Sequence, residues 1–344
     1  MARIDVGILG ATGMVGQQFV ALLARHPWFR VAWLGASERS AGKKYRDAAA
    51  WRLSALLPDE VANLDVQAAT PSASAPQLVF SGLDSSVAGE IEGAFAQAGH
   101  TIVSNSKNYR MESDVPLLIP EVNGDHLALL KAQASRGWKG RIVTNPNCST
   151  VVLSMALAPL RQFGLTKVTI TTLQAISGAG YPGVPSWDIL GNVIPFIDGE
   201  EQKIETETRK ILGCVTANKV EPHPVVISAQ TTRVAVQNGH TESISAAFDH
   251  RPAEDDLIAA WTTFKALDGL PSAPAQPIVY LRDRNRPQPA LDVHRGDGMT
   301  VTVGRLRPCP ILDYKFIALG HNTIRGAAGV AILNAELMHR EGLL

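Results

Sequence analysis

Short apolar runs recur through the first 145 residues of the chain. They occupy residues 4–9, 31–36, 78–81 and 101–104, and a further run ends at residue 143. The stretch after the first run places an apolar stripe, from Phe19 to Leu23, on one side of a helix. Apolar strands that alternate with amphipathic helices are typical of an open α/β sheet. The pattern therefore predicts such a sheet for the first part of the chain.

A glycine-rich turn joins the first predicted strand to the first predicted helix. It contains Gly10, Gly13 and Gly16, the spacing of a dinucleotide-binding turn. Gly10 permits the tight turn, Gly13 lets the backbone approach a pyrophosphate, and Gly16 allows close packing of helix on strand. We therefore predict a Rossmann-type domain whose cofactor contacts are Gly10, Thr12, Gly13, Met14, Val15 and Gly16.

The end of the second predicted strand indicates which dinucleotide binds, because the adenosine ribose is read there. Glu38 could accept a hydrogen bond from the free 2′-hydroxyl of NAD. Its neighbours Ser37, Arg39, Ser40 and Lys43 instead offer hydroxyl donors and positive charge, which suit a 2′-phosphate. We favour NADP, with NAD as the alternative.

The loop after residue 104 brings two cations to another strand end. Lys107 and Arg110 lie there among amide and hydroxyl side chains. Open α/β sheets bind ligands at the carboxyl ends of their strands. Both residues are candidate ligands of an anion. Alternatively, either residue is an ordinary charged side chain on the surface.

Cys148 is the strongest candidate for chemistry. It follows a Pro-Asn turn, and the apolar run behind it, residues 151–160, predicts that a helix begins at the cysteine. The N–H groups at a helix start favour negative charge, so we expect a depressed thiol pKa. The amide of Cys148 is also placed to hold the oxyanion that forms when a thiolate attacks a carbonyl.

The rest of the second half supplies further polar candidates. A strand over residues 168–176 leads into the glycine-rich loop 177–183, and residues 200–212 have helix character. We predict a later strand that places Arg233, Ala235 and Gln237 on one side. His240 follows the turn signal Asn238-Gly239 and is a candidate acid/base.

Composition narrows the class of protein. The 344 residues carry 32 basic and 32 acidic side chains, so no net field favours nucleic acid or an anionic membrane. The three cysteines are far apart, which fits neither a disulfide framework nor a zinc cluster. No apolar run approaches the length needed to span a bilayer. We therefore expect a cytoplasmic enzyme with no metal site.

Seven segments together resemble aspartate-β-semialdehyde dehydrogenases of the archaeal and fungal branch. They occur in the family's order, and the resemblance spans residues 4 to about 335. The segments are residues 10–16, 37–44, 145–150, 174–183, 200–203, 238–242 and 322–329. The resemblance implies a second, α+β domain of the glyceraldehyde-3-phosphate-dehydrogenase-like type. It implies an NADP-binding domain over residues 1–145, completed by a C-terminal helix at about 325–344, and a catalytic and dimerisation domain over 146–324.

The resemblance also implies a role for individual residues. Cys148 matches the nucleophile, His240 the acid/base, and Gln174 the residue that orients substrate. The substrate ligands would be Arg233 for the α-carboxylate, Glu200 for the ammonium group, Lys203 and Arg110 for phosphate, and Asn147 beside the thiol. Ser177, Gly178 and Asn322 would join the cofactor site, Asn322 at the nicotinamide carboxamide.

The implied reaction converts L-aspartyl-4-phosphate to L-aspartate-4-semialdehyde and phosphate with NADPH, through a cysteine thioacyl intermediate. It belongs to the biosynthesis of lysine, threonine and methionine, and the resemblance implies a homodimer or homotetramer. Three alternatives remain from the sequence. They are a malonyl-CoA-type thioester reductase, an N-acetylglutamyl-phosphate reductase, and a dinucleotide-sensing protein without catalysis.

Overall fold

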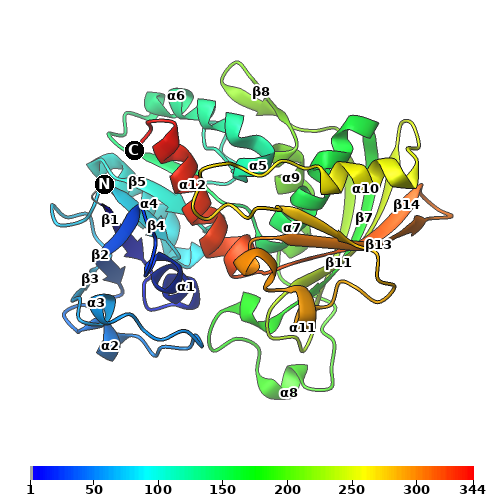
Figure 1. Ribbon diagram of the computed structural model, residues 1–344. Coiled ribbons are helices and arrows are strands. Elements are labelled where there is room, and N and C mark those ends of the chain that lie inside the picture. Colours follow the sequence, from blue (N-terminus) through cyan, green and yellow to red (C-terminus); the bar gives the residue numbers. More distant parts are fainter. Residues whose placement is uncertain (1–2) are drawn as a thin grey trace.

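The computed structural model describes residues 3–344, which form two six-stranded β-sheets and a two-stranded hairpin, with helices packed around the large sheets (Figure 1). The first sheet has six parallel strands in the order β3-β2-β1-β4-β5-β6. Its strands are β1 (Ile4–Leu9), β2 (Phe29–Ala36), β3 (Val66–Ala68), β4 (Leu78–Ser81), β5 (Thr101–Ser104) and β6 (Arg141–Thr144). Strand order reverses beside β1, where such sheets bind ligands.

Short and long helices connect these strands. They are α1 (Met14–Leu23), α2 (Tyr45–Ala48), α3 (Asp59–Ala62), α4 (Ser85–Ala98), α5 (Pro120–Asn123) and α6 (Leu130–Gln133), with 3₁₀ turns at Gly124–Leu129 and Ala134–Arg136. Helix α1 begins directly after the glycine turn and buries Phe19, Val20 and Leu23 against the sheet. The open α/β sheet predicted from the apolar runs is confirmed.

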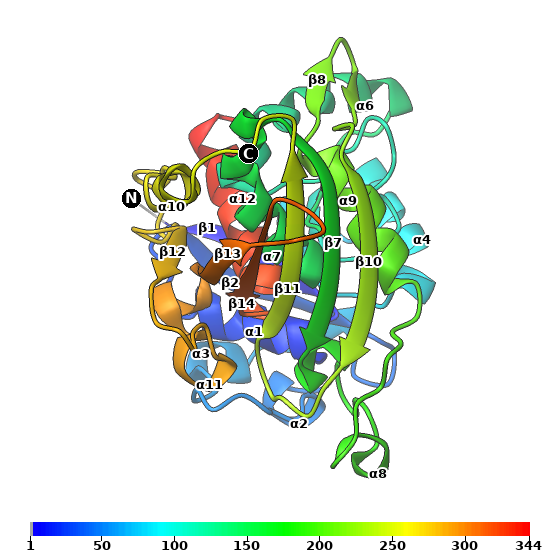
Figure 2. The same cartoon turned by 90° about the vertical axis from the view of Figure 1, so that its right-hand side faces the viewer.

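The second sheet is mixed, in the order β10-β7-β11-β14-β13-β12. Its strands are β7 (Leu165–Gln174), β10 (Val226–Arg233), β11 (His240–Phe248), β12 (Ile278–Leu281), β13 (Val301–Pro308) and β14 (Tyr314–Gly320); β8 (Cys214–Thr216) and β9 (Lys219–Glu221) form a separate hairpin. Burial alternates along β7, so one face of the sheet packs on helices and the other is open to solvent. Figure 2 looks onto β10, β7 and β11.

The second half of the chain also forms helices, several of which pack on the buried face of this sheet. They are α7 (Cys148–Leu157), α8 (Ser186–Ile189), α9 (Glu200–Ile211), α10 (Glu254–Thr262), α11 (Pro289–Asp292) and α12 (Gly329–Arg340), with 3₁₀ turns at Ala158–Phe163, Ile176–Ala179 and Arg295–Gly298. Helix α7 is buried almost throughout and forms the centre of the second core. It carries Cys148 at its first position.

The end of the chain returns to the first sheet. A π-helical turn, Ile324–Ala328, runs directly into α12. Ala331, Ile332 and Leu333 of α12 belong to the same apolar cluster as Phe19 and Phe80. Figure 1 shows α12, in red, beside the first sheet. Helix α12 therefore shares its apolar core with the first sheet.

The predicted strand through Arg233, Ala235 and Gln237 is wrong beyond its first residue. Strand β10 ends at Arg233, and the next residues leave the sheet as a loop. The amide of Val234 still donates to Gln174, but that of Val236 turns back to the carbonyl of Val234 at 2.8 Å. Gly239 then takes a positive φ of 102°, which completes the turn. The backbone groups of this segment therefore form local hydrogen bonds in place of the hydrogen-bond ladder of a β-sheet.

Candidate active site

The glycine turn has the geometry that its sequence predicts. Gly10 has a positive φ of 70°, and a Cβ there would lie 2.7 Å from the carbonyl oxygen of Gly82. A Cβ on Gly16 would lie 2.3 Å from the carbonyl oxygen of Gly10, so only glycine fits. No side chain caps α1, which starts after Gly13. Its first N–H groups are therefore available to a pyrophosphate, and the turn fits a dinucleotide.

A cavity of about 610 Å³ extends from this turn to the cysteine. It brings together most residues predicted to bind the cofactor. The predicted site residues that line it are Gly10, Thr12, Gly13, Met14, Val15 and Ser37, together with Arg110, Asn147, Cys148, Ser177, Gly178 and Asn322. The cavity thus joins the glycine turn and the cysteine in one space.

The loop proposed to read the 2′-position begins at the edge of this cavity. Ser37 lines the cavity and accepts a hydrogen bond from the amide of Ser40 within a tight turn. Arg39 and Lys43 are exposed on the same loop, and with Ser40 they lie outside the cavity lining. Both cations are therefore exposed on a loop whose first residue, Ser37, lines the cavity.

Asn147 shapes the start of α7. Its side-chain Oδ1 accepts hydrogen bonds from the amides of Ser149 at 3.0 Å and Thr150 at 3.2 Å. This cap satisfies two of the N–H groups that have no helical acceptor in the first turn of α7. The cap does not engage the amide of Cys148.

Three predicted residues lie in one row across the second sheet. Arg233 pairs with Gln174 across β10 and β7, and Gln174 Nε2 lies 3.4 Å from Nε2 of His240 on β11. All three side chains are buried. The row faces α7, and His240 Nε2 lies 3.1 Å from Cys148 Sγ. A thiol and an imidazole at this distance are the arrangement of an activated nucleophile.

A backbone amide decides how the His240 ring carries its proton. The N–H of Ala175 donates to His240 Nδ1 at 3.1 Å, so Nδ1 acts as an acceptor. A neutral imidazole has one donor and one acceptor nitrogen. Nε2 therefore carries the proton and donates it toward Cys148 Sγ. This tautomer stabilises a thiolate and supplies a proton at the reacting atoms.

The expectation of a depressed thiol pKa is wrong for the free enzyme. Burial, together with the nearby Glu200 carboxylate, raises the pKa of Cys148 to about 12. Burial also lowers the pKa of His240 to about 3. Desolvation of a charge in this buried site outweighs the favourable helix start, which is worth only about 0.3–2 kcal/mol. The resting pair is therefore a neutral thiol and a neutral imidazole.

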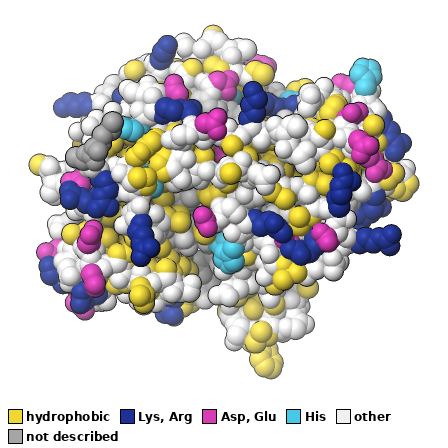
Figure 3. All heavy atoms as spheres, viewed as in Figure 1, with side chains coloured by type: hydrophobic (Ala, Val, Ile, Leu, Met, Phe, Trp, Pro, Cys, Tyr) yellow, Lys and Arg dark blue, Asp and Glu magenta, His cyan; other side chains and the backbone are white. Residues whose placement is uncertain are grey.

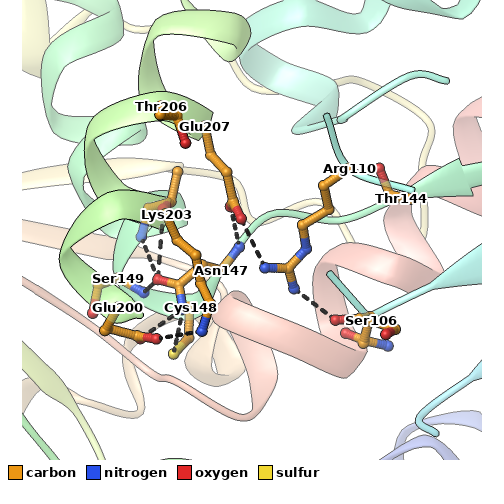
Figure 4. A network of polar contacts seen from close by, with 12 residues as sticks. Ser106, Arg110, Thr144, Asn147, Cys148, Ser149, Glu200, Lys203, Thr206 and Glu207 are labelled. Carbon is orange, nitrogen blue, oxygen red and sulfur yellow. Dashed lines mark hydrogen bonds and ion pairs between the residues drawn. The ribbon is translucent and has the colours of Figure 1, made fainter. Parts of the chain in front are cut away.

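Glu200 is the hub of a polar network beside the thiol, shown in Figure 4. Its Oε1 accepts from Asn147 Nδ2 at 2.6 Å and from Gln174 Nε2 at 3.1 Å, and its Oε2 pairs with Lys203 Nζ at 3.1 Å. Burial by itself would raise the pKa of Glu200, but Lys203 and the two amides hold it below its usual value. Glu200 is thus an ionised carboxylate close to Cys148.

Arg233 and Asn322 fix the loop that follows β7. Arg233 Nη1 donates to the carbonyl of Ala175 at 2.7 Å, and burial lowers the pKa of its guanidinium. Asn322 Nδ2 donates to Ser177 Oγ at 2.8 Å, and its Oδ1 accepts the amide of Gly239 at 2.9 Å. These bonds hold the start of the loop after β7 next to the row of buried side chains.

Arg110 has partners that the sequence did not reveal. Its Nη1 pairs with Glu207 at 2.9 Å, and its Nη2 donates to the carbonyl of Asn105 at 2.6 Å. Glu207 lies seven residues after Glu200 on the predicted helix, so both face the same side. This seven-residue spacing is the feature of the sequence that could have identified Glu207 as a site residue.

Two family models match the chain. They describe a semialdehyde dehydrogenase NAD-binding domain, over residues 5–130, and a semialdehyde dehydrogenase dimerisation domain, over residues 157–325. Among curated proteins, the aspartate-semialdehyde dehydrogenase of Archaeoglobus fulgidus is 49% identical over 343 residues, and the match covers 99% of this chain and 100% of that protein. The enzyme of Schizosaccharomyces pombe is 48% identical over 357 residues and covers 100% of each.

Solved structures agree. The aspartate-semialdehyde dehydrogenase of Candida albicans with NADP superposes with a TM-score of 0.92 at 45% identity, over 100% of both chains. Aspartate-semialdehyde dehydrogenase II of Vibrio cholerae, complexed with ASA, gives 0.80 at 25% identity over 99% of each. With the cysteine, histidine and glycine turn in one cavity, these matches show that the chain belongs to the aspartate-semialdehyde dehydrogenase family.

Proposed function

We propose that the protein catalyses the NADPH-dependent reductive dephosphorylation of L-aspartyl-4-phosphate to L-aspartate-4-semialdehyde and phosphate. The observation that carries this function is the 3.1 Å contact between Cys148 Sγ and His240 Nε2, in a protein whose cavity leads from Cys148 to the glycine turn. Relatives named aspartate-semialdehyde dehydrogenase match nearly the whole chain. This reaction is a step in the biosynthesis of lysine, threonine and methionine.

Cys148 and His240 perform the covalent steps. The Cys148 sulfur attacks the acyl carbon, the carbon–oxygen bond to phosphate breaks, the thiol proton passes to the departing phosphate, and a thioester remains on the sulfur. NADPH, when bound on the glycine turn, supplies the hydride that reduces this thioester. The Cys148 amide holds the resulting oxyanion, and collapse of the thiohemiacetal releases the aldehyde. His240 Nε2–H stabilises the thiolate and protonates oxygen at this position.

Buried charges around the thiol read the substrate. Arg233 presents a planar guanidinium suited to the α-carboxylate. Glu200 offers an ionised carboxylate to the ammonium group, and Gln174 orients the carbonyl between them. Lys203 and Arg110 supply the positive charge for phosphate. The acyl-CoA alternative needs no acid for an ammonium group, so ionised Glu200 beside Cys148 favours an amino-acid substrate.

The cofactor is NADP. The Candida albicans relative was solved with NADP, and the turn of residues 10–16 fits a dinucleotide in this chain. Ser37, Arg39, Ser40 and Lys43 would contact the 2′-phosphate. Asn322 and Ser177 would meet the nicotinamide half, because both line the cavity near Cys148.

The second half associates with another copy of the chain, as the dimerisation-domain match indicates. The solvent-facing side of β7 carries Thr169, Thr171 and Leu173, the last 41% exposed. A protruding segment around α8 adds Trp187, 93% exposed, and hydrophobic side chains gather at its tip in Figure 3. We propose a homodimer through the β7 face, with the homotetramer as a further assembly.

We also propose two domains in each copy. Residues 1–145, completed by the C-terminal helix at about 325–344, form the NADP-binding domain, and residues 146–324 form the catalytic and dimerisation domain.

No helix in residues 3–344 is long and apolar enough to cross a bilayer. Cys148, Cys214 and Cys309 are all unpaired in the structure. A reducing compartment keeps thiols in this state. We therefore place the enzyme in the cytoplasm.

A spectrophotometric assay tests the function. Aspartate semialdehyde, phosphate and NADP should together give NADPH, and omission of phosphate should abolish the signal. Cys148→Ser should lose activity by orders of magnitude and keep NADP affinity. Turnover of malonyl-CoA with NADPH, without turnover of aspartate semialdehyde, would refute the assignment.

A further inference from the structure

One face of α9 connects the cysteine turn to the loop that carries Arg110. Glu207 lies in the middle of this face and is buried. Its Oε2 accepts the backbone N–H of Asn147 at 2.7 Å, and its Oε1 accepts Arg110 Nη1 at 2.9 Å. Figure 4 shows the carboxylate between these two partners. A single side chain therefore bridges two segments far apart in sequence.

The contact to Asn147 matters for the nucleophile. Asn147 caps α7 and immediately precedes Cys148, and only 7% of it is exposed. Its backbone N–H lies outside the helix and has no helical acceptor. A buried donor without a partner is costly, about 1–3 kcal/mol. Glu207 satisfies this donor and so fixes the turn that aims the thiol.

The contact to Arg110 matters for the phosphate side of the cavity. Arg110 lines the cavity, yet only 7% of it is exposed. Its guanidinium is pinned by Glu207 and by the carbonyl of Asn105. An arginine held by a carboxylate on one edge keeps its other N–H groups in a fixed direction. Glu207 thereby sets where this positive charge lies relative to the thiol.

Lys210, one turn further along α9, anchors the same loop. Its Nζ donates to the carbonyls of Arg110 and Glu112, both at 2.7 Å, and of Val115 at 2.9 Å. The backbone of the loop is therefore fixed without Glu207. Glu207 has the separate task of orienting the Arg110 side chain, and the test below depends on that separation.

We propose that Glu207 is a positioning residue that holds the Arg110 guanidinium and the Cys148 turn in one fixed arrangement. The proposal rests on the function given above, in which Arg110 binds the phosphoryl group. The acyl carbon and the phosphoryl oxygens of one substrate must meet both groups at once. A displacement of about 1 Å at either group is sufficient to cost about 100-fold in rate.

Glu207→Gln is the sharpest variant, because it keeps the size and removes the second acceptor. A glutamine has one carbonyl oxygen and one amide nitrogen. It can accept from Asn147 or from Arg110, but it presents donors to the other. The matched control is Glu205→Gln on the same helix, since within residues 3–344 Glu205 accepts only the amide of Ala229, at 3.0 Å, on β10.

The readouts are KM for phosphate, KM for NADP and kcat in the aspartate semialdehyde reaction, with the rate of Cys148 carboxamidomethylation by iodoacetamide. We expect Glu207→Gln to raise KM for phosphate at least tenfold, lower kcat and change the alkylation rate, with KM for NADP unchanged. Glu205→Gln should match the wild type in all four. A merely structural loss would scale activity with the folded fraction and leave both KM values unchanged.

Unchanged KM for phosphate and unchanged alkylation in a folded Glu207→Gln would overturn the proposal. If that variant does not fold, Glu207→Asp decides, because it keeps the charge and falls short of both partners. Wild-type KM for phosphate in Glu207→Asp refutes the role, and an increase of several-fold supports it. A wild type that forms no NADPH from aspartate semialdehyde and phosphate contradicts the proposed function instead.

Discussion

At the residue scale, the thiol and imidazole are close in space and neutral at rest. Burial raises the pKa of Cys148 to about 12 and lowers that of His240 to about 3, so neither charge is favoured before substrate arrives. The phosphoryl group of the substrate brings a basic oxygen that accepts the thiol proton as the sulfur attacks. The His240 Nε2–H, fixed by Ala175, is then the donor that meets the developing thiolate.

The raised pKa of Cys148 predicts a pH dependence of alkylation in the free enzyme. Below its pKa, the thiolate fraction rises about tenfold for each pH unit. The rate of iodoacetamide labelling at Cys148, followed by peptide mass spectrometry, should therefore still be rising between about pH 7 and pH 9. A rate that is already constant above pH 7 would show a thiolate–imidazolium pair and contradict this prediction.

The buried charged side chains of Arg233 and Glu200 predict how substitutions at these positions change substrate recognition. Arg233→Lys should weaken transition-state binding, measured from kcat/KM, by about 2 kcal/mol or more, because an ammonium cannot reproduce a two-pronged charge-assisted contact. Glu200→Gln should reduce turnover of aspartate semialdehyde more than turnover of an analogue without the amino group. His240→Asn serves as the control and should reduce both alike. Equal losses for Glu200→Gln would assign Glu200 to structure.

At the element scale, the site depends on how closely the C-terminal π-helical turn approaches α7. A Cβ on Gly326 would lie 2.7 Å from the Cβ of Cys148 and 3.0 Å from its Cα. The absence of a side chain at Gly326 therefore sets the position of the nucleophile. The sequence of residues 322–329 indicates the family motif. Only the packing shows that a side chain at Gly326 would collide with Cys148.

Gly326→Ala tests this contact. Overpacking should push Cys148 away from His240, destabilise the fold by about 1–3 kcal/mol and reduce kcat by about 10- to 100-fold. Urea unfolding and steady-state kinetics measure the two effects. Gly342→Ala is the control, because a Cβ there has no neighbour within 4 Å in the described part of the chain. Its strained positive φ of 68° should cost stability without a loss of kcat. Full kcat in Gly326→Ala would refute the argument.

At the scale of the whole molecule, the solvent-facing side of the second sheet predicts where two copies meet. Leu173→Glu places charge on that face, and a two-fold interface repeats each substitution. Sedimentation velocity should show a shift toward monomer at micromolar concentration. Leu56→Glu, at a residue that is 92% exposed on the first half, should leave the assembly unchanged. An unshifted Leu173→Glu would place the interface elsewhere.

Local signals in the sequence were sufficient for the elements that begin or end the site. The glycine turn, the parallel sheet and the start of α7 at Cys148 follow from short-range rules of backbone geometry and apolar periodicity. The family and the fold class were predicted and are confirmed. The individual roles of the site residues stay predictions.

Only the tertiary structure decided the charge state of the thiol and the partners of Arg110. A pKa depends on how much water and charge surround a group, and helix position alone gave the wrong direction for Cys148. The Glu207 carboxylate meets Asn147 and Arg110 only because α9 packs across both segments. Local sequence determines elements, whereas desolvation and long-range contacts exist only once those elements are packed together.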